Sequence, residues 1–162
     1  VIAITGENGI GKSSLVKVIT GEFTGRYSGT IDLNQNLVVS EIRQIAYNRG
    51  FLHEFAKEEN LNLEMFMNNL RKLGIERKVS EQKIENMSQG QQRKIELARS
   101  LTKPAHIYLW DEPLNYLDVF NQEQIIKIIK NSKPSMIVIE HDETFIERVA
   151  DKKIELFKPD VM

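Results

Sequence analysis

The residues best placed to do chemistry lie at the start of the chain, where a glycine-rich loop follows the short apolar run Val1 to Thr5. Residues 6–13 read Gly-Glu-Asn-Gly-Ile-Gly-Lys-Ser, and the stretch from Ser13 to Thr20 predicts a helix. A strand, then G-x-x-x-x-G-K-[ST], then a helix is the order of a phosphate-binding P-loop. The residues predicted to bind a nucleotide are Gly6, Glu7, Asn8, Gly9, Ile10, Gly11, Lys12, Ser13 and Ser14.

The loop's backbone explains why these residue types suit phosphate. Glycines let successive N–H groups turn inward, and the helix that follows adds the positive end of its dipole. Lys12 can reach the β- and γ-phosphates, and the Ser13 hydroxyl can ligate Mg²⁺. The alternative is a glycine-rich turn that binds nothing, which the strand and helix on either side disfavour.

Two carboxylates follow the apolar strand predicted for residues 106–110. Asp111 would then be held at the carboxyl end of a buried strand, where it can bind Mg²⁺ directly or through water. Glu112 points elsewhere and can orient or deprotonate a water. The alternative is a strand end with two solvated acids, which the P-loop upstream disfavours.

Two further positions allow a structural interpretation. Ser88 begins a predicted helix, and its hydroxyl and neighbouring N–H groups suit an anion, although the residues alone favour a plain helix N-cap. His141 follows an apolar strand predicted for Met136 to Glu140, and alone it is more typical of a core histidine.

The remaining pattern alternates strands and helices, which predicts an α/β fold with a mostly parallel sheet. A helical insert from about residue 51 to residue 86 interrupts that alternation. The Asn-rich stretch at residues 34–36 predicts a turn between two short strands, Thr30 to Leu33 and Leu37 to Ile42. Further predicted helices cover residues 51–59, 61–73, 91–101, 121–130 and 143–150, and a last strand covers residues 153–157.

Composition sets broader limits. The 162 residues are 41% hydrophobic and 28% charged with a net charge of −1, so the chain can bury a core and has no global basic field. It has no cysteine, which excludes disulfides and thiolate metal sites. No apolar run approaches the ~20 residues of a membrane span. Because the chain opens at Val1 on the P-loop strand, we expect it to be a piece of a longer polypeptide.

Several segments, in order, resemble motifs of the ABC-type ATPases. Residues 87–91, Met-Ser-Gln-Gly-Gln, resemble the signature Leu-Ser-Gly-Gly-Gln, with Gln89 in place of a glycine. Gln44 resembles the Q-loop glutamine; Gln35 is a nearby alternative in a poorer loop context. Leu117-Asp118 resembles the D-loop, and His141 resembles the switch histidine.

This resemblance implies one ATP-binding domain over residues 1–162. It implies a P-loop NTPase (RecA-like) core, with a helical signature subdomain inserted at about residues 51–100. It further implies that part of the antiparallel β subdomain and the adenine-stacking aromatic precede residue 1. The strand before His141 should lie between the strands that carry the P-loop and Asp111, and Glu140 should be structural.

The resemblance also assigns roles in binding ATP and Mg²⁺. Glu112, His141 and Gln44 would be catalytic, and Ser13, Gln44 and Asp111 would hold the metal. The residues that would contact ATP bound to a second ABC ATPase domain, or line that interface, are Ser88, Gly90, Gln91 and Asp118 of the D-loop.

Residues 111–118 and 139–142 resemble the corresponding runs of ABC-F proteins, and Leu114, Tyr116 and residues 48–50 resemble the antibiotic-resistance branch. This implies the second of two tandem ATPase domains in a cytoplasmic, ribosome-binding protein that contacts rRNA. One alternative is the ATP-binding subunit of an ABC transporter, with a membrane-domain partner. Another is a DNA-repair ATPase of the structural-maintenance kind, which the lack of long coiled-coil heptads disfavours.

Overall fold

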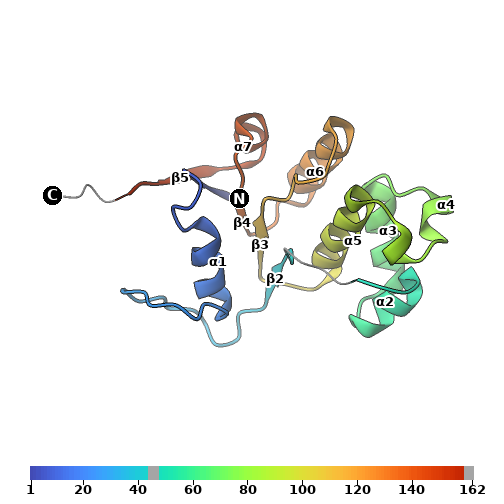
Figure 1. Cartoon of the computed structure of the whole chain (residues 1–162), viewed down its shortest axis with the longest axis horizontal. Helices are drawn as coiled ribbons and strands as arrows, with labels where there is room; N and C mark the ends of the chain where they lie inside the picture. Colours follow the sequence, from blue (N-terminus) through green and yellow to red (C-terminus); the bar gives the residue numbers. More distant parts are fainter. Residues whose placement is uncertain (44–47, 159–162) are drawn as a thin grey trace.

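The computed structural model describes residues 1–43 and 48–158, and a five-stranded sheet forms its centre (Figure 1). The strands follow the order β2-β3-β4-β1-β5, and every pairing is parallel. The predicted α/β fold with a mostly parallel sheet is therefore confirmed. The strands are β1 (Ile2–Gly6), β2 (Val39–Glu41), β3 (Ile107–Asp111), β4 (Met136–Ile139) and β5 (Lys152–Leu156).

The register of the sheet brings three strand ends to one level. Ile139 at the end of β4 pairs with Ile4 of β1 and with Asp111 of β3. Strand β4 lies between β1 and β3, as the resemblance implied. Since carboxyl ends of parallel strands meet at one edge, the loops after β1, β3 and β4 emerge side by side.

The two faces of the sheet are covered by different helices. On one face, Val16 of α1 (Lys12–Thr20) packs against Ile4, Leu109 and Ile139. The residues next to these in sequence point to the other face, because side chains alternate along a strand. There the core continues into the helices that follow β2, β3 and β4, with α1 on the opposite side (Figure 1).

Several helices begin where a polar side chain caps them. Asn62, Asp118 and Asp142 each accept a hydrogen bond from the backbone N–H three residues later. Within the described ranges, no helix combines the length and apolar character needed to cross a membrane. The helices after α1 are α2 (Leu52–Glu58), α3 (Leu63–Lys72), α4 (Arg77–Ser80), the 3₁₀ helix η1 (Ile84–Asn86), α5 (Gln89–Thr102), α6 (Val119–Ser132) and α7 (Glu143–Val149).

The predicted strand Thr30 to Leu33 is wrong. The turn itself is present, because Leu37 N donates to Asn34 O at 2.9 Å and Asn36 N donates to the Asn34 side chain at 2.9 Å. Residues 30–36 are exposed, and the second predicted strand, shortened to β2, pairs with β3 instead. A two-stranded hairpin without a covering layer is marginal in water, whereas pairing with β3 extends a buried sheet.

Candidate functional site

The predicted P-loop connects β1 to α1 and is shaped by its glycines. Gly6 has φ 141°, and a Cβ there would lie 2.7 Å from the Leu156 carbonyl oxygen, so only glycine fits. Gly9 (φ 78°) and Gly11 (φ 107°) take left-handed conformations and have open space around a hypothetical Cβ. The loop backbone is therefore free to approach a bulky anion closely.

Lys12 lies inside this loop. Its ammonium donates to the carbonyl oxygens of Gly6 at 2.8 Å and Glu7 at 2.9 Å, and its side chain is buried. Ser13 is exposed in the first turn of α1. Of the other residues predicted here, Ile10 N donates to Glu7 O at 3.3 Å across Asn8 and Gly9, and Ser14 follows in the helix. The predicted phosphate-binding residues thus form one continuous loop and helix start.

The two acids at the carboxyl end of β3 differ in exposure. Asp111 is buried, whereas the Glu112 side chain is 38% exposed. Glu112 has φ 49°, and its N–H donates to Ile139 O at 2.8 Å, which fixes its backbone against β4. Asn115 Nδ2 donates to Glu112 Oε2 at 2.7 Å. The carboxylate is thus oriented by a neighbour while part of it stays open to solvent.

Arg93 of α5 hydrogen-bonds to the backbone at the same strand end. Its Nη2 donates to the carbonyl oxygens of Glu112 at 2.6 Å and Asp111 at 3.1 Å. Burial lowers the pKa of the Arg93 guanidinium, although four nearby carboxylates oppose that shift. The helix that begins at Ser88 is therefore joined directly to the backbone of the two acids.

His141 lies beside Glu112, as the shared edge of the sheet requires. The distance from His141 Nε2 to Glu112 Oε1 is 3.7 Å, and the His141 side chain is 43% exposed. Glu140 is buried and uses both carboxylate oxygens on backbone, accepting from His141 N at 2.8 Å and Leu114 N at 3.3 Å. These contacts are those of a structural residue.

Ser88, Gly90 and Gln91 lie at the N-terminus of α5. The predicted N-cap is present: Ser88 Oγ accepts from Gln91 N at 3.2 Å, and Gln91 Oε1 accepts from Ser88 N at 2.9 Å. A Cβ on Gly90 would lie 2.8 Å from Tyr116 O, so the D-loop segment approaches the helix too closely for a side chain. Asp118 caps α6, with its Oδ1 accepting from Asn121 N at 2.8 Å.

The structure therefore brings some predicted site residues together and separates others. The P-loop, Asp111, Glu112 and His141 share the carboxyl edge of β1, β3 and β4. The segment of Ser88 and Gly90 lies with the D-loop on the opposite side of the sheet from α1 (Figure 1). Gln44, predicted to be catalytic and to hold metal, falls outside the described residues.

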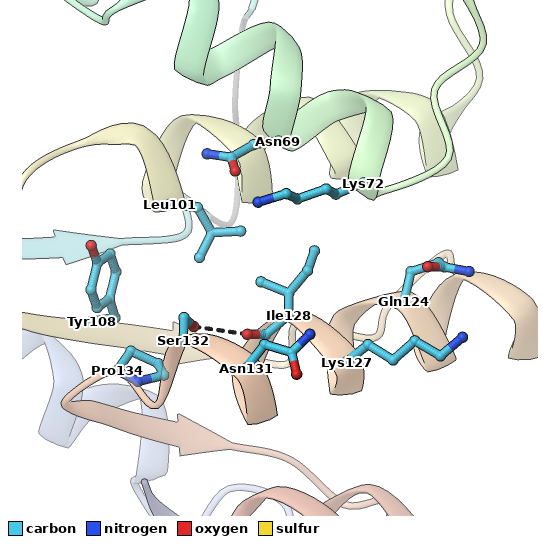
Figure 2. A pocket seen from close by; sticks show the side chains of 10 residues that line it. All are labelled: Asn69, Lys72, Leu101, Tyr108, Gln124, Lys127, Ile128, Asn131, Ser132 and Pro134. Carbon is cyan, nitrogen blue, oxygen red and sulfur yellow. Dashed lines mark hydrogen bonds between the residues drawn. The ribbon is translucent and has the colours of Figure 1, made fainter.

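A cavity of about 680 Å³ lies elsewhere, between α3, α5, β3 and α6 (Figure 2). Its lining includes Asn69, Lys72, Tyr108 and Lys127, and none of the predicted site residues. Figure 2 shows the Lys72 ammonium turned toward Asn69, whereas the Lys127 ammonium points away. The residues that suit nucleotide chemistry lie instead at the carboxyl edge of the sheet.

Comparison with known proteins agrees with this architecture. The family model described as "ABC transporter" matches residues 1–115, so the chain belongs to this family as an ATP-binding domain. The chain is similar to the ribosome protection protein VmlR of Bacillus subtilis, with 26% identity over 94% of this chain and 28% of that protein. It is 31% identical to the erythromycin resistance ATP-binding protein MsrA of Staphylococcus epidermidis, over 96% of this chain and 31% of that protein.

A solved structure titled RNase-L Inhibitor superposes with a TM-score of 0.77 and 27% identity over 95% of this chain and 31% of that chain. The chain thus spans less than a third of the length of the three proteins named. Membership of the family supports ATP binding and, in general, ATP hydrolysis.

The site fits the nucleotide and the cation that such a domain uses. Gly9 and Gly11 leave open space at the loop, and the carbonyl oxygens of Gly6 and Glu7 hold the Lys12 ammonium there. Mg²⁺ is usually bound through one or two protein oxygens plus substrate phosphates, and the Ser13 hydroxyl and the Asp111 carboxylate are oxygen donors of that kind. In the described part of the chain no cluster of three or more His, Asp or Glu side chains offers a separate metal site.

Sequence reasoning assigned no role to two residues that hold Glu112, and only one of them lies far from it along the chain. Arg93 donates to the Glu112 carbonyl oxygen from 19 positions away, and Asn115 donates to the Glu112 carboxylate from three positions away. The lone signal for Asn115 was its place in the run that follows the two acids. Arg93 gives no signal, because an arginine within a predicted helix is most often on the surface.

Proposed function

We propose that residues 1–162 form one ATP-binding domain of an ABC-F protein that protects the ribosome from antibiotics, and that this domain is the second of two in tandem. The observation that carries the proposal is the run from Asp111 to Asp118. It resembles the ABC-F pattern, and it lies where the sheet edge meets the start of α5. The similarity to the proteins named for ribosome protection and erythromycin resistance supports the same assignment.

In this proposal ATP binds to the P-loop, with Lys12 neutralising the β- and γ-phosphates. Ser13, Asp111 and Gln44 hold Mg²⁺, which supplies positive charge to the phosphate oxygens. Glu112, oriented by Asn115, polarises the attacking water and takes its proton. His141, 3.7 Å from the same carboxylate, contacts the γ-phosphate and keeps Glu112 aimed at the water. The role of Asn115 adds one residue to those inferred from the sequence.

The site is completed by a second ATPase domain. Ser88, Gly90 and Gln91 would contact ATP bound to that domain, because they lie across the sheet from this chain's own P-loop. Three exposed apolar side chains beside the D-loop support an interface at this position, since exposed apolar clusters mark contact surfaces. They are Tyr116, Val119 and Phe120, next to Asp118 of the D-loop. ATP then closes the two domains and hydrolysis opens them.

Ribosome binding tests the proposal. In the full-length cytoplasmic protein, glutamine replaces Glu112 and its counterpart in the other ATPase domain. We expect ATP to hold the domains closed and the protein to co-sediment with ribosomes in ATP but not in ADP. Lys12→Ala in the same background is the matched control and should abolish co-sedimentation by preventing ATP binding. A variant that associates with a membrane protein and never with ribosomes would replace the proposal with the transporter alternative.

A further inference from the structure

The cavity of Figure 2 lies at the amino edge of the sheet, away from the P-loop. Tyr108, in its lining, is the second residue of β3 and pairs with Met136, the first residue of β4. The nucleotide-binding residues follow the other ends of these strands. The volume of about 680 Å³ falls within the roughly 300–1,000 Å³ typical of small-molecule sites, so this cavity can hold a ligand of its own.

Three side chains form an apolar floor to the cavity, namely Leu101, Tyr108 and Ile128. All three are partly buried and pack against the main hydrophobic core, which holds them in place. Burial raises the pKa of the Tyr108 hydroxyl, so this side chain stays neutral at physiological pH. A ligand with an apolar body would therefore lie on this floor without meeting a charge there.

The charge in the lining is entirely positive. It includes Lys72 and Lys127 and neither Asp nor Glu. Lys127 points away from the cavity, whereas the Lys72 ammonium is turned toward Asn69, inside it (Figure 2). Lys72 forms no ion pair with any residue that the structure describes. One unpaired cation therefore faces the cavity.

Side-chain amides add hydrogen-bonding groups around this cation. Asn69 Nδ2 is already used, because it donates to Thr102 Oγ1 at 3.0 Å. Gln124 and Asn131 also line the cavity, and within residues 1–43 and 48–158 their amides have no hydrogen-bond partner. Their N–H groups can thus donate to an anionic ligand.

Lys72 also has an ordinary structural role, since a cation in the last turn of a helix is stabilised by the helix dipole. Lys57 occupies the same place in α2 and does not line the cavity. The dipole accounts equally for both lysines. It does not account for the apolar floor and the amides that surround only Lys72.

We propose that this cavity binds a small organic carboxylate, whose apolar body lies on the floor and whose carboxylate pairs with the Lys72 ammonium. A single facing cation matches the single charge of a carboxylate better than the two charges of a phosphate. The ligand would contact α3, which belongs to the helical insert, and α6, which belongs to the core. No nucleotide-binding residue takes part, so the inference is independent of the proposed function.

The probe for this site is 2-naphthoate, titrated calorimetrically into the full-length protein. Saturating Mg·ADP fills the nucleotide sites, so that they retain no probe, and 2-naphthamide serves as the neutral counterpart of the probe. Lys72→Met removes the charge, and Asn131→Phe fills the cavity while leaving Lys72 in place. Lys57→Met is the matched control, because it removes a lysine from the last turn of a neighbouring helix.

We expect 2-naphthoate to bind and to slow hydrogen exchange in peptides that cover α3 and residues 124–132. Lys72→Met should weaken binding about tenfold or more, the effect of losing a hydrogen bond to a charged group, and 2-naphthamide should bind more weakly by a similar factor. Asn131→Phe should also weaken binding, whereas Lys57→Met should leave it within about twofold. ATP turnover without the probe should equal wild type in all three variants, which separates this test from that of the proposed function.

Four results would overturn the proposal. They are the absence of binding at millimolar 2-naphthoate, equal affinity for 2-naphthamide, equal weakening by Lys57→Met, and slowed exchange only outside α3 and residues 124–132. Displacement of the probe by an oligoglutamate peptide that binds more tightly would replace the small ligand with an acidic segment of a partner protein. If Asn131→Phe does not fold, the comparison of Lys72→Met with Lys57→Met still decides.

Discussion

Two clusters in this chain pair a carboxylate with cationic or polar partners, and they do so in opposite ways. At the sheet edge, Glu112 is 38% exposed, lies 3.7 Å from His141 Nε2 and accepts one short hydrogen bond, from Asn115. On α5, Glu96 is 2% exposed and accepts from Arg43, Arg99 and Asn48. Glu112 therefore keeps oxygen lone pairs available, whereas hydrogen-bond donors occupy both carboxylate oxygens of Glu96.

The difference follows from where each residue sits in the fold. Glu112 comes directly after a buried strand, so its backbone is fixed while its side chain extends beyond the sheet. Glu96 is on the buried side of a helix that packs against α3 and β2, where a charge must be paired to be tolerated. A reacting carboxylate must be positioned while some of its oxygen lone pairs stay free. A buried structural carboxylate needs hydrogen-bond donors on both of its oxygens.

The largest expected effect concerns the exposed carboxylate, Glu112. Glu112→Gln keeps the shape and the hydrogen bonds of the side chain but removes the base. Turnover should fall by about 10²–10⁴-fold, the usual contribution of a positioned acid or base. That loss equals about 3–5 kcal/mol of barrier. Steady-state phosphate release measures it.

The thermal midpoint of the same variant should stay at the wild-type value, because Glu112 is not saturated by native contacts. A variant that hydrolyses ATP at the wild-type rate would remove Glu112 from the mechanism. A variant that loses stability as well as activity would show that Glu112 resembles Glu96 more than the geometry indicates.

The second effect concerns the buried carboxylate, Glu96, and is a dependence of stability on pH. The pKa of Glu96 is lowered from 4.5 to about 2 in the folded chain, so the folded state binds fewer protons than the unfolded state in that interval. The stabilisation is complete above about pH 5 and is lost as the pH falls toward 2. The free energy of unfolding should drop by about 3 kcal/mol from this group. Urea unfolding at a series of pH values measures the slope.

Glu96→Gln is the control for that measurement, since it has no proton to take up at this position. Its free energy of unfolding should be lower at neutral pH and should vary less between pH 5 and pH 2. Glu59, whose pKa is also lowered because the hydrogen bonds from Arg43 and Lys103 outweigh its burial, will leave a residual slope. An identical slope in the variant and the wild type would show that Glu96 does not stay ionised by pairing.

The exposed cluster was largely predictable from the sequence and the buried one was not. Local sequence motifs predict the chemistry of the P-loop, Asp111 and Glu112. The alternation of strands and helices then predicts that these motifs meet at one edge of the sheet. The contacts of Glu96 join residues 53 and 48 positions apart, and no periodicity records them. The wrong strand at residues 30–33 has a related cause. Local propensity favoured a hairpin, but β2 found its partner in β3, far along the chain.

The smallest expected effect sharpens the comparison with a third pair, on the surface between α6 and α7. The Arg148 side chain donates two hydrogen bonds to Glu123, as the Arg43 side chain does to Glu96, but the Glu123 side chain is 38% exposed and that of Arg148 36%. Exposed pairs gain little over their hydration and are screened by salt, so Glu123→Gln should leave the thermal midpoint within error of wild type. Glu147→Gln, also an exposed glutamate on these two helices, controls for the change in net charge.

A destabilisation by Glu123→Gln as large as the loss from protonating Glu96 would mean that bidentate geometry, and not burial, sets the strength of such pairs. The contrast between the saturated and the available carboxylate would then need another explanation.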